Sequence, residues 1–190
     1  WRLWDYWERH LDPDLFVDRS LKGRVRNKVV VITGGSSGIG LSTAQRVAEA
    51  GAVTIIVARG EAELHKARDD MKAKGGKVFA YTSDLSDMAD CDRLVKTVLE
   101  AHGHVDVLVN NAGRSIRRSI ELSYDRFHDF ERTMQLNYFG SLRLIMGLLP
   151  TMTHRRRGHI INISSIGVLA NSPRFSAYVA SKAALDAWSR

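Results

Sequence analysis

The amino-acid sequence predicts an α/β fold built on a doubly wound parallel sheet, and three observations support this prediction. Short β-branched runs alternate with helical patterns from Lys28 onward, which is typical of parallel strands joined by crossover helices. The first run leads into a glycine-rich turn at residues 33–40, which in turn opens a helix. Further polar motifs follow in a definite order at the ends of later runs, where the carboxyl edge of such a sheet is expected.

The alternation gives the elements in order. The first helix should end at Gly51 and the second at Gly75-Gly76, because glycine is a common residue just past a helix C-terminus. The fourth helix carries more apolar surface than one sheet face needs, so we expect a homo-oligomer formed through the long helices. The predicted strands are 28–33, 53–58, 77–82, 105–109 and 158–163, and the predicted helices are 39–50, 61–74, 87–102, 124–153 and 175–189.

Length and composition indicate one globular domain. The chain has 190 residues, of which 44% are hydrophobic, enough to bury a core. We assign residues 28–190 to a dinucleotide-binding domain and residues 1–27 to a linker or docking segment. A doubly wound fold usually adds a sixth strand after this point, so we expect the C-terminal part of the domain to be missing after Arg190.

The tryptophan-rich opening differs in composition from the rest of the chain. Trp4, Trp7 and Leu11 fall on one side of a helix, which predicts either a docking helix over an apolar groove or a contact with another domain or partner. Because the sequence begins with Trp1 and not with Met, we also expect it to be a piece of a longer protein.

The net charge of +7 raises the question of nucleic acid. Two arginine clusters, at residues 114–118 and 155–157, could be a solvated face or a seat for a polyanionic small molecule. Neither is interleaved with aromatics, and no nucleic-acid-binding motif is present, so we expect no nucleic-acid partner.

Location and metal content follow from what the sequence lacks. No apolar run is long enough to predict a transmembrane segment. Cys91 is the single cysteine, so neither a disulfide framework nor a cysteine metal site is expected. We therefore predict a cytoplasmic protein without a metal centre.

The glycine-rich turn predicts a phosphate site. Its glycines follow a G-x-x-x-G-x-G spacing. Residues without Cβ allow positive φ and let backbone N–H groups approach a pyrophosphate, while the helix N-terminus adds its dipole. Two serine hydroxyls of the turn can donate to the same phosphates. The predicted cofactor-binding residues are Gly34, Ser36, Ser37, Gly38, Ile39 and Gly40.

The end of the second strand distinguishes between cofactors. An NAD site usually offers a carboxylate there for the ribose hydroxyls, whereas this sequence has Arg59. A guanidinium suits a 2′-phosphate through bidentate pairing, so NADP(H) is favoured over NAD, unless Arg59 points into solvent. Asp84-Leu85 follows the third strand, where Asp84 is either an acceptor for the adenine amine or a turn residue before a cap at Ser86.

Tyr178 and Lys182 are four residues apart on a predicted helix, so both project from one face. A phenol exchanges its proton poorly at neutral pH, and a neighbouring ammonium stabilises the phenolate. We predict that Tyr178 protonates a carbonyl oxygen as hydride arrives and that Lys182 also holds the nicotinamide ribose.

Two further polar residues complete a predicted reacting centre. Ser165 follows a strand and can hydrogen-bond the substrate carbonyl together with Tyr178, whereas Ser164 should point elsewhere. Asn137 lies inside the long predicted helix, which asparagine does not favour. A buried amide there would be explained if it anchored a water that relays protons to Lys182.

The segments Thr33–Gly40, Asn110–Gly113 and Tyr178–Lys182, with Asn137 and Ser165, together resemble the short-chain dehydrogenase/reductase family over residues 28–190. This resemblance implies a Rossmann fold, NAD(P)-dependent oxidoreductase activity and a catalytic tetrad. The implied tetrad is Asn137, Ser165, Tyr178 and Lys182, and the resemblance adds Asn110, Asn111, Ala112 and Gly113 to the cofactor site.

The segments 110–119, 127–140 and 163–171 look like the C-terminal reductase domain of bacterial multidomain fatty acyl-CoA reductases. That likeness implies an upstream reductase domain and NADPH-dependent reduction of a fatty acyl-CoA or fatty aldehyde. It also makes both arginine clusters candidates for binding coenzyme A phosphates. Two alternatives stay open, namely a generic carbonyl or hydroxy-compound oxidoreductase and a nucleotide-binding module without turnover.

Overall fold

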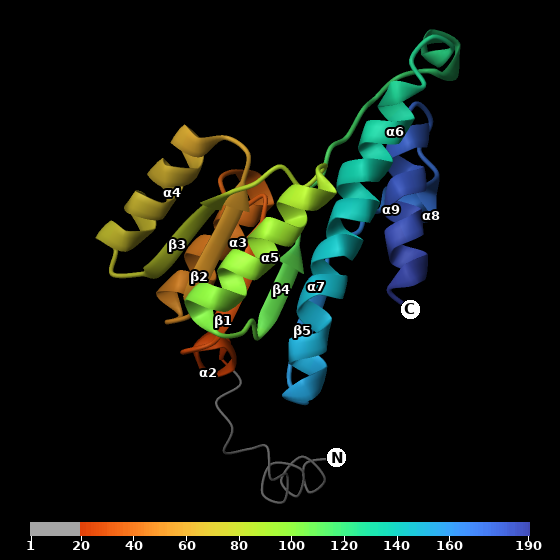
Figure 1. The fold of residues 1–190 in the computed structure, drawn as a ribbon. Helices are drawn as coiled ribbons and strands as arrows, with labels where there is room; N and C mark the ends of the chain where they lie inside the picture. The colour runs from red at the N-terminus through yellow and green to blue at the C-terminus, as the bar shows by residue number, and fades with distance from the viewer. Residues whose placement is uncertain (1–19) are drawn as a thin grey trace, which may run out of the picture.

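The computed structural model describes residues 20–190 (Figure 1). The docking helix predicted around Trp4, Trp7 and Leu11 lies outside the described residues.

Five parallel strands form one sheet in the order β3-β2-β1-β4-β5. The chain winds from β1 outward to β3 and then returns to the other side of β1, which makes the boundary between β1 and β4 the switch point of the sheet. This confirms the predicted doubly wound fold. The strands are β1 Val29–Thr33, β2 Val53–Ala58, β3 Lys77–Thr82, β4 Val107–Asn110 and β5 His159–Asn162.

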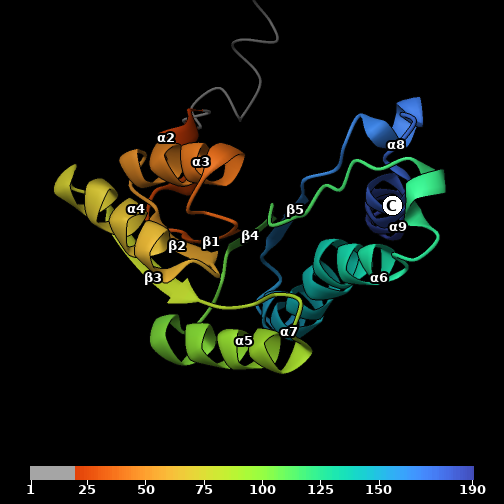
Figure 2. The ribbon, with the colours of Figure 1, turned by 90° about the horizontal axis from the view of Figure 1, so that it is seen from above.

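Helices cover both faces of this sheet. In Figure 2, α2, α3 and α4 lie on one face and α5 and α7 on the other. The first group is α2 Leu21–Val25, α3 Gly38–Glu49 and α4 Glu61–Ala73, and the second is α5 Met88–His102 and α7 Ser141–His154. The remaining helical segments are η2 Ile120–Ser123, α6 His128–Met134, η3 Gln135–Gly140, α8 Gly167–Ala170 and α9 Ser176–Trp188.

The core consists of two apolar clusters, one on each face. Residues of β1 alternate between them, so that Val31 packs with the cluster under α5 and α7, whereas Val30 and Ile32 pack with the cluster under α3 and α4. All five residues of β1 are buried because this strand is central and covered on both sides. The glycine turn that follows β1 therefore starts from a rigid strand.

The long helix predicted over 124–153 is different in the structure. A short 3₁₀ turn, η2, comes first, and the helix that follows begins at His128 and is interrupted by a π-helical segment at Gln135–Gly140. Gly140, at the end of this segment, allows the backbone after β3 to approach closely, because a Cβ there would collide with the carbonyl oxygen of Leu85. The π turn places Asn137 fully buried in the interior.

No helix among residues 20–190 is long and apolar enough to cross a membrane. No cluster of three metal-ligating side chains occurs in the same part of the chain.

Candidate active site

The turn between β1 and α3 is shaped by glycines. Gly34 and Gly38 have φ values of +66° and +53°, in the left-handed region that glycine adopts without strain. Gly40 does not have a positive φ, but its surroundings are crowded. A Cβ there would collide with the carbonyl of Gly34 and lie 2.5 Å from Nδ2 of Asn111. Two of these positions thus need glycine for conformation and one for space.

The start of α3 is open toward this turn. Ser37 is the N-cap residue, but its side chain makes no capping hydrogen bond, which leaves first-turn N–H groups available to an anion. Ser36 is half-buried and Ser37 exposed. The side chain of Ile39 is 67% exposed, so this residue can contribute to a phosphate site only through its backbone.

The motif Asn110–Gly113 ties this turn to β4. The backbone N–H groups of Asn111 and Ala112 donate to Oγ1 of Thr33, at 3.0 and 2.9 Å. Nδ2 of Asn111 donates to the carbonyl of Thr33 at 2.9 Å, and Nδ2 of Asn110 donates to Oδ1 of Asn162 on β5 at 2.9 Å. Both asparagine side chains therefore hold the edge of the sheet together.

A pocket of about 240 Å³ opens beside the turn, at the carboxyl ends of β1, β2 and β4. The pocket has the features that a dinucleotide requires, namely glycine backbone that a Cβ would fill, an open helix N-terminus and an unpartnered hydroxyl on Ser83, which is 3% exposed. The lining includes Gly34, Ser36, Arg59, Leu85, Ala112 and Gly113.

Arg59 and Asp84 face each other across this pocket mouth. Their closest atoms are 3.9 Å apart, and both side chains are about half exposed. Oδ1 of Asp84 accepts from the backbone and hydroxyl of Ser86, at 3.0 and 2.6 Å, which is the turn role that the sequence left open. Desolvation raises the pKa of Asp84, but these hydrogen bonds outweigh it and the net shift is downward.

The predicted cap at Ser86 is wrong. Asp87 is the N-cap of α5, and its side chain accepts from the N–H of Ala89 at 2.9 Å. Ser86 is instead used by Asp84 to close the preceding turn.

Asn137 joins three segments of the site. Its Oδ1 accepts from the backbone N–H of Arg114 at 2.7 Å, while its Nδ2 donates to the Arg114 carbonyl and to Oγ of Ser181, both at 2.9 Å. This side-chain amide is thus held by protein atoms on both its oxygen and its nitrogen, and the water relay that the sequence analysis assigned to Asn137 stays a prediction. The geometry makes Asn137 a clamp between the asparagine motif and α9.

Lys182 is buried at the same place, with 4% exposure. Its Nζ donates to the carbonyl of Ile163 at 2.7 Å, and a Cβ built on Gly113 would lie 3.5 Å from Nζ and 3.3 Å from Oδ1 of Asn137. Burial lowers the pKa of Lys182 from its usual value. The lysine therefore lies beside the inner end of the cofactor pocket.

Tyr178 lies one turn before Lys182 on α9, with its ring edge-on to Phe175. Its carbonyl accepts from Oγ of Ser181, which links Tyr178 to Asn137 through one hydroxyl. Ser165 lies in the loop after β5, three residues beyond the strand end, where its Oγ accepts from the N–H of Gly167 at 3.1 Å.

The two arginine clusters lie at opposite edges of the sheet. Arg118 pairs with Asp129 on α6, beyond the carboxyl ends of the strands (Figure 1). Arg155 donates to Asp106 at 2.9 Å and immediately precedes β5, so residues 155–157 lie at the amino edge. Residues 155–157 thus lie away from the edge that carries the glycine turn, and their candidate role toward coenzyme A phosphates stays a prediction.

The sequence analysis assigned no individual role to Thr33, although it lies in the glycine-turn motif, and it did not identify Ser83. Thr33 accepts two backbone N–H groups and donates to the carbonyl of Val109, so it connects β1 to the asparagine motif. Each residue ends or directly follows a strand at the carboxyl edge, and that position was the available signal.

The structure thus combines a glycine turn at the switch point, an open pocket beside it and a Tyr178/Lys182 helix. These features are typical of the dinucleotide-binding fold of NAD(P)-dependent oxidoreductases. The chain belongs to the short chain dehydrogenase family, which matches residues 28–190. A protein named fatty acyl-CoA reductase from Acinetobacter baylyi is 58% identical over 166 residues. That match covers 87% of this chain but 56% of the relative, so the chain spans little more than half of that protein's length.

Solved structures of this family share the fold. A metagenomic short-chain oxidoreductase in complex with NADP is 32% identical, with a TM-score of 0.82 and coverage of 86% of this chain and 74% of that one. A xylitol dehydrogenase bound to NAD⁺ is 28% identical, with a TM-score of 0.81 and coverage of 87% and 63%. Both cofactors thus occur among similar structures.

Proposed function

We propose that this chain reduces the carbonyl of a fatty acyl-CoA or fatty aldehyde with NADPH. The observation that supports the proposal is that Gly113, which lines the pocket beside the glycine turn, lies next to both Lys182 and Asn137. The acyl-CoA specificity rests on the similarity to the Acinetobacter reductase.

NADPH bound at the glycine turn supplies the hydride. The hydroxyl of Ser165 polarises the substrate carbonyl, and Tyr178 donates a proton to its oxygen. Lys182, held by the Ile163 carbonyl, stabilises with its positive charge the phenolate left on Tyr178, and the phenolate regains its proton from solvent. Asn137 positions Arg114 and Ser181 around this centre.

For a thioester, the carbonyl carbon gains the hydride and the oxygen gains a proton, which gives a hemithioacetal. The hydroxyl of that product then loses its proton, the C–S bond breaks, and the thiol leaves as an aldehyde forms. The residues of this site need no further redox partner for that step.

NADPH is proposed over NADH because of Arg59. Its guanidinium is half exposed at the pocket mouth. It has a long contact of 3.9 Å to a carboxylate oxygen of Asp84, so a 2′-phosphate can compete with Asp84 for the guanidinium. The acidic residue that would favour a bare ribose is not at this position.

The test is cofactor oxidation by the protein in its full natural length, followed at 340 nm with a long-chain acyl-CoA and with NADPH or NADH, with the aldehyde product identified. The proposal predicts acyl-CoA-dependent oxidation of NADPH. Turnover of sugars or polyols without any acyl-CoA or aldehyde reduction would instead support the generic oxidoreductase, which the similarity to a xylitol dehydrogenase favours.

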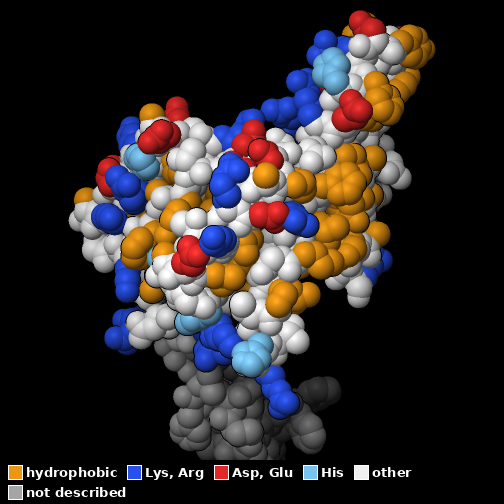
Figure 3. Space-filling view, in the orientation of Figure 1, with side chains coloured by type: hydrophobic (Ala, Val, Ile, Leu, Met, Phe, Trp, Pro, Cys, Tyr) orange, Lys and Arg blue, Asp and Glu red, His pale blue; other side chains and the backbone are white. Residues whose placement is uncertain are grey.

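Two partners of the chain are also proposed. Hydrophobic side chains gather on the surface over α7 (Figure 3). Among them, Phe139, Met146 and Leu149 are 44%, 50% and 38% exposed on η3 and α7, and we assign this face to a second copy of the chain. The opening segment 1–27 is proposed to link an upstream domain, and the whole protein is proposed to act in the cytoplasm.

A further inference from the structure

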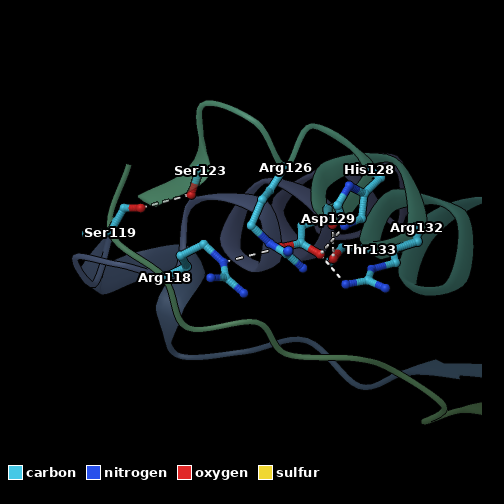
Figure 4. A network of polar contacts seen from close by, with 8 residues as sticks. All are labelled: Arg118, Ser119, Ser123, Arg126, His128, Asp129, Arg132 and Thr133. Carbon is cyan, nitrogen blue, oxygen red and sulfur yellow. Dashed lines mark hydrogen bonds and ion pairs between the residues drawn. The ribbon is translucent and has the colours of Figure 1, made fainter. Parts of the chain in front are cut away.

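One carboxylate on α6 is surrounded by more positive charge than it neutralises (Figure 4). Asp129 is paired with Arg118 at 3.3 Å, with Arg126 at 3.1 Å and with Arg132. Within residues 20–190, every ion pair of these three arginines goes to Asp129. Three guanidiniums against one carboxylate leave a net charge of +2, before any contribution from His128, whose ring lies 3.5 Å away.

Asp129 organises these cations without covering them. Its side chain is 3% exposed, whereas the side chains of Arg118, Arg126 and Arg132 are 33%, 35% and 45% exposed. Desolvation raises the pKa of Asp129, but hydrogen bonds from Arg126 and Arg132 outweigh it and lower the pKa to about 2. The carboxylate therefore stays ionised and fixes the guanidiniums, which keep N–H groups free to bind an anion.

The arginine cluster around Asp129 lies beyond the same edge of the sheet as the reacting centre, the edge formed by the carboxyl ends of the strands (Figure 1). Asp129 and Asn137 are eight residues apart along one continuous helical run, which corresponds to about 12 Å. The backbone N–H of Arg118 donates to the carbonyl of Arg174 at 2.7 Å, and Arg174 lies four residues before Tyr178. The cluster is thus joined to the loop that leads into the catalytic helix.

We propose that Arg118, Arg126 and Arg132 form a subsite for the phosphate groups of a coenzyme A thioester. This inference rests on the proposed acyl-CoA function. The pantetheine arm separates the thioester carbonyl from the diphosphate and the 3′-phosphate, so the carbonyl can lie at Tyr178 while the phosphates reach the arginines. Guanidiniums held in fixed orientation bind phosphate oxygens in bidentate geometry.

This assignment differs from the one made from the sequence. The sequence grouped Arg118 with its neighbours Arg114 and Arg117. The structure groups it instead with Arg126, in the turn before α6, and with Arg132, on α6, through a shared carboxylate. The phosphates of the dinucleotide are proposed at the glycine turn of α3, so the two anion sites are separate.

The experiment compares substrates with and without phosphates in the full natural-length protein. Arg126→Gln, Arg132→Gln and the double variant are assayed with a long-chain acyl-CoA, with the matching N-acetylcysteamine thioester and with the matching aldehyde. Arg143→Gln is the control, because Arg143 is also an arginine paired with an aspartate, Asp92, but lies on α7. Circular dichroism and the KM for NADPH show whether each variant is folded.

The inference predicts that the double variant raises the KM for acyl-CoA roughly tenfold or more, because hydrogen bonds between charged groups are lost. The KM values for the two phosphate-free substrates and for NADPH should stay within twofold of wild type. An unchanged KM for acyl-CoA, or an equal rise for all three substrates, overturns the subsite.

Failure of the proposed function would look different. A wild-type protein that reduces neither thioester refutes acyl-CoA reduction, and the subsite is then decided by calorimetric titration with free coenzyme A. Binding that is lost in the double variant and kept in Arg143→Gln supports the subsite, whereas no binding to wild type overturns it.

Discussion

At the scale of single residues, the site is held by buried polar side chains that bind backbone groups far along the chain. Thr33 reaches residues 109, 111 and 112, and Asn137 reaches Arg114 and Ser181. The sequence predicted which residue types would gather at the carboxyl edge. It could not predict their partners, because those depend on long-range packing and not on spacing.

The buried environment of Lys182 predicts an altered titration. Because burial disfavours the ammonium, the pKa of Lys182 lies below the ordinary lysine value of about 10.4. The protonated lysine therefore opposes folding. This cost starts to fall as the pH rises through the folded-state pKa and is gone only above the unfolded-state value of about 10.4. A ¹³C NMR titration of the lysine Cε signals, with the Lys182 signal assigned by its loss in Lys182→Arg, should show that Lys182 deprotonates at a lower pH than the other lysines. A transition at the ordinary value would contradict this.

Arg59 should determine cofactor preference. Arg59→Leu removes the guanidinium proposed to bind the 2′-phosphate, so the KM for NADPH should rise roughly tenfold while that for NADH stays unchanged. Steady-state kinetics with both cofactors measure this, with Arg68→Leu on α4 as the control. Equal changes in the KM values for NADPH and NADH would show that Arg59 does not bind the 2′-phosphate.

At the scale of elements, the turn from β1 into α3 has the strictest geometry. Gly40→Ala introduces a methyl group against the Gly34 carbonyl and the Asn111 amide, which should cost about 1–3 kcal/mol and weaken NADPH binding about tenfold. Gly75→Ala is a matched control, because Gly75 has a φ of +86° but open space around it.

Thermal unfolding and fluorescence titration with NADPH distinguish the two variants. The control Gly75→Ala should lose roughly 1 kcal/mol of stability, because residue 75 has a positive φ, and should bind NADPH as tightly as wild type. If Gly40→Ala binds NADPH as tightly as wild type, the crowding at this turn does not matter for the cofactor.

Most elements follow from the sequence pattern, and the exceptions have physical reasons. Each observed strand falls within two residues of its prediction, since β-branched runs mark buried parallel strands. The run predicted as one helix over 124–153 contains α6, η3 and α7, because apolar periodicity does not distinguish an α-helix from a π-helical segment. The cap at Asp87 was missed because Ser86 offered an equally good side chain.

At the scale of the whole molecule, the exposed apolar face of α7 tests the proposed homo-oligomer. Met146→Asp places a charge among Phe139 and Leu149, so the sedimentation coefficient should fall to that of a monomer. Lys96→Ala on α5 is a control away from that face. Wild-type protein that already sediments as a monomer at micromolar concentration would contradict the proposal.

The central claim is that Tyr178 supplies the proton for carbonyl reduction, and one comparison tests it most directly. Tyr178→Phe removes only a hydroxyl, so the account predicts that the kcat for NADPH oxidation with acyl-CoA or aldehyde falls about 100- to 10,000-fold. The Kd for NADPH should stay within twofold of wild type. A variant that binds NADPH normally and still turns over at a rate near that of wild type would contradict the account.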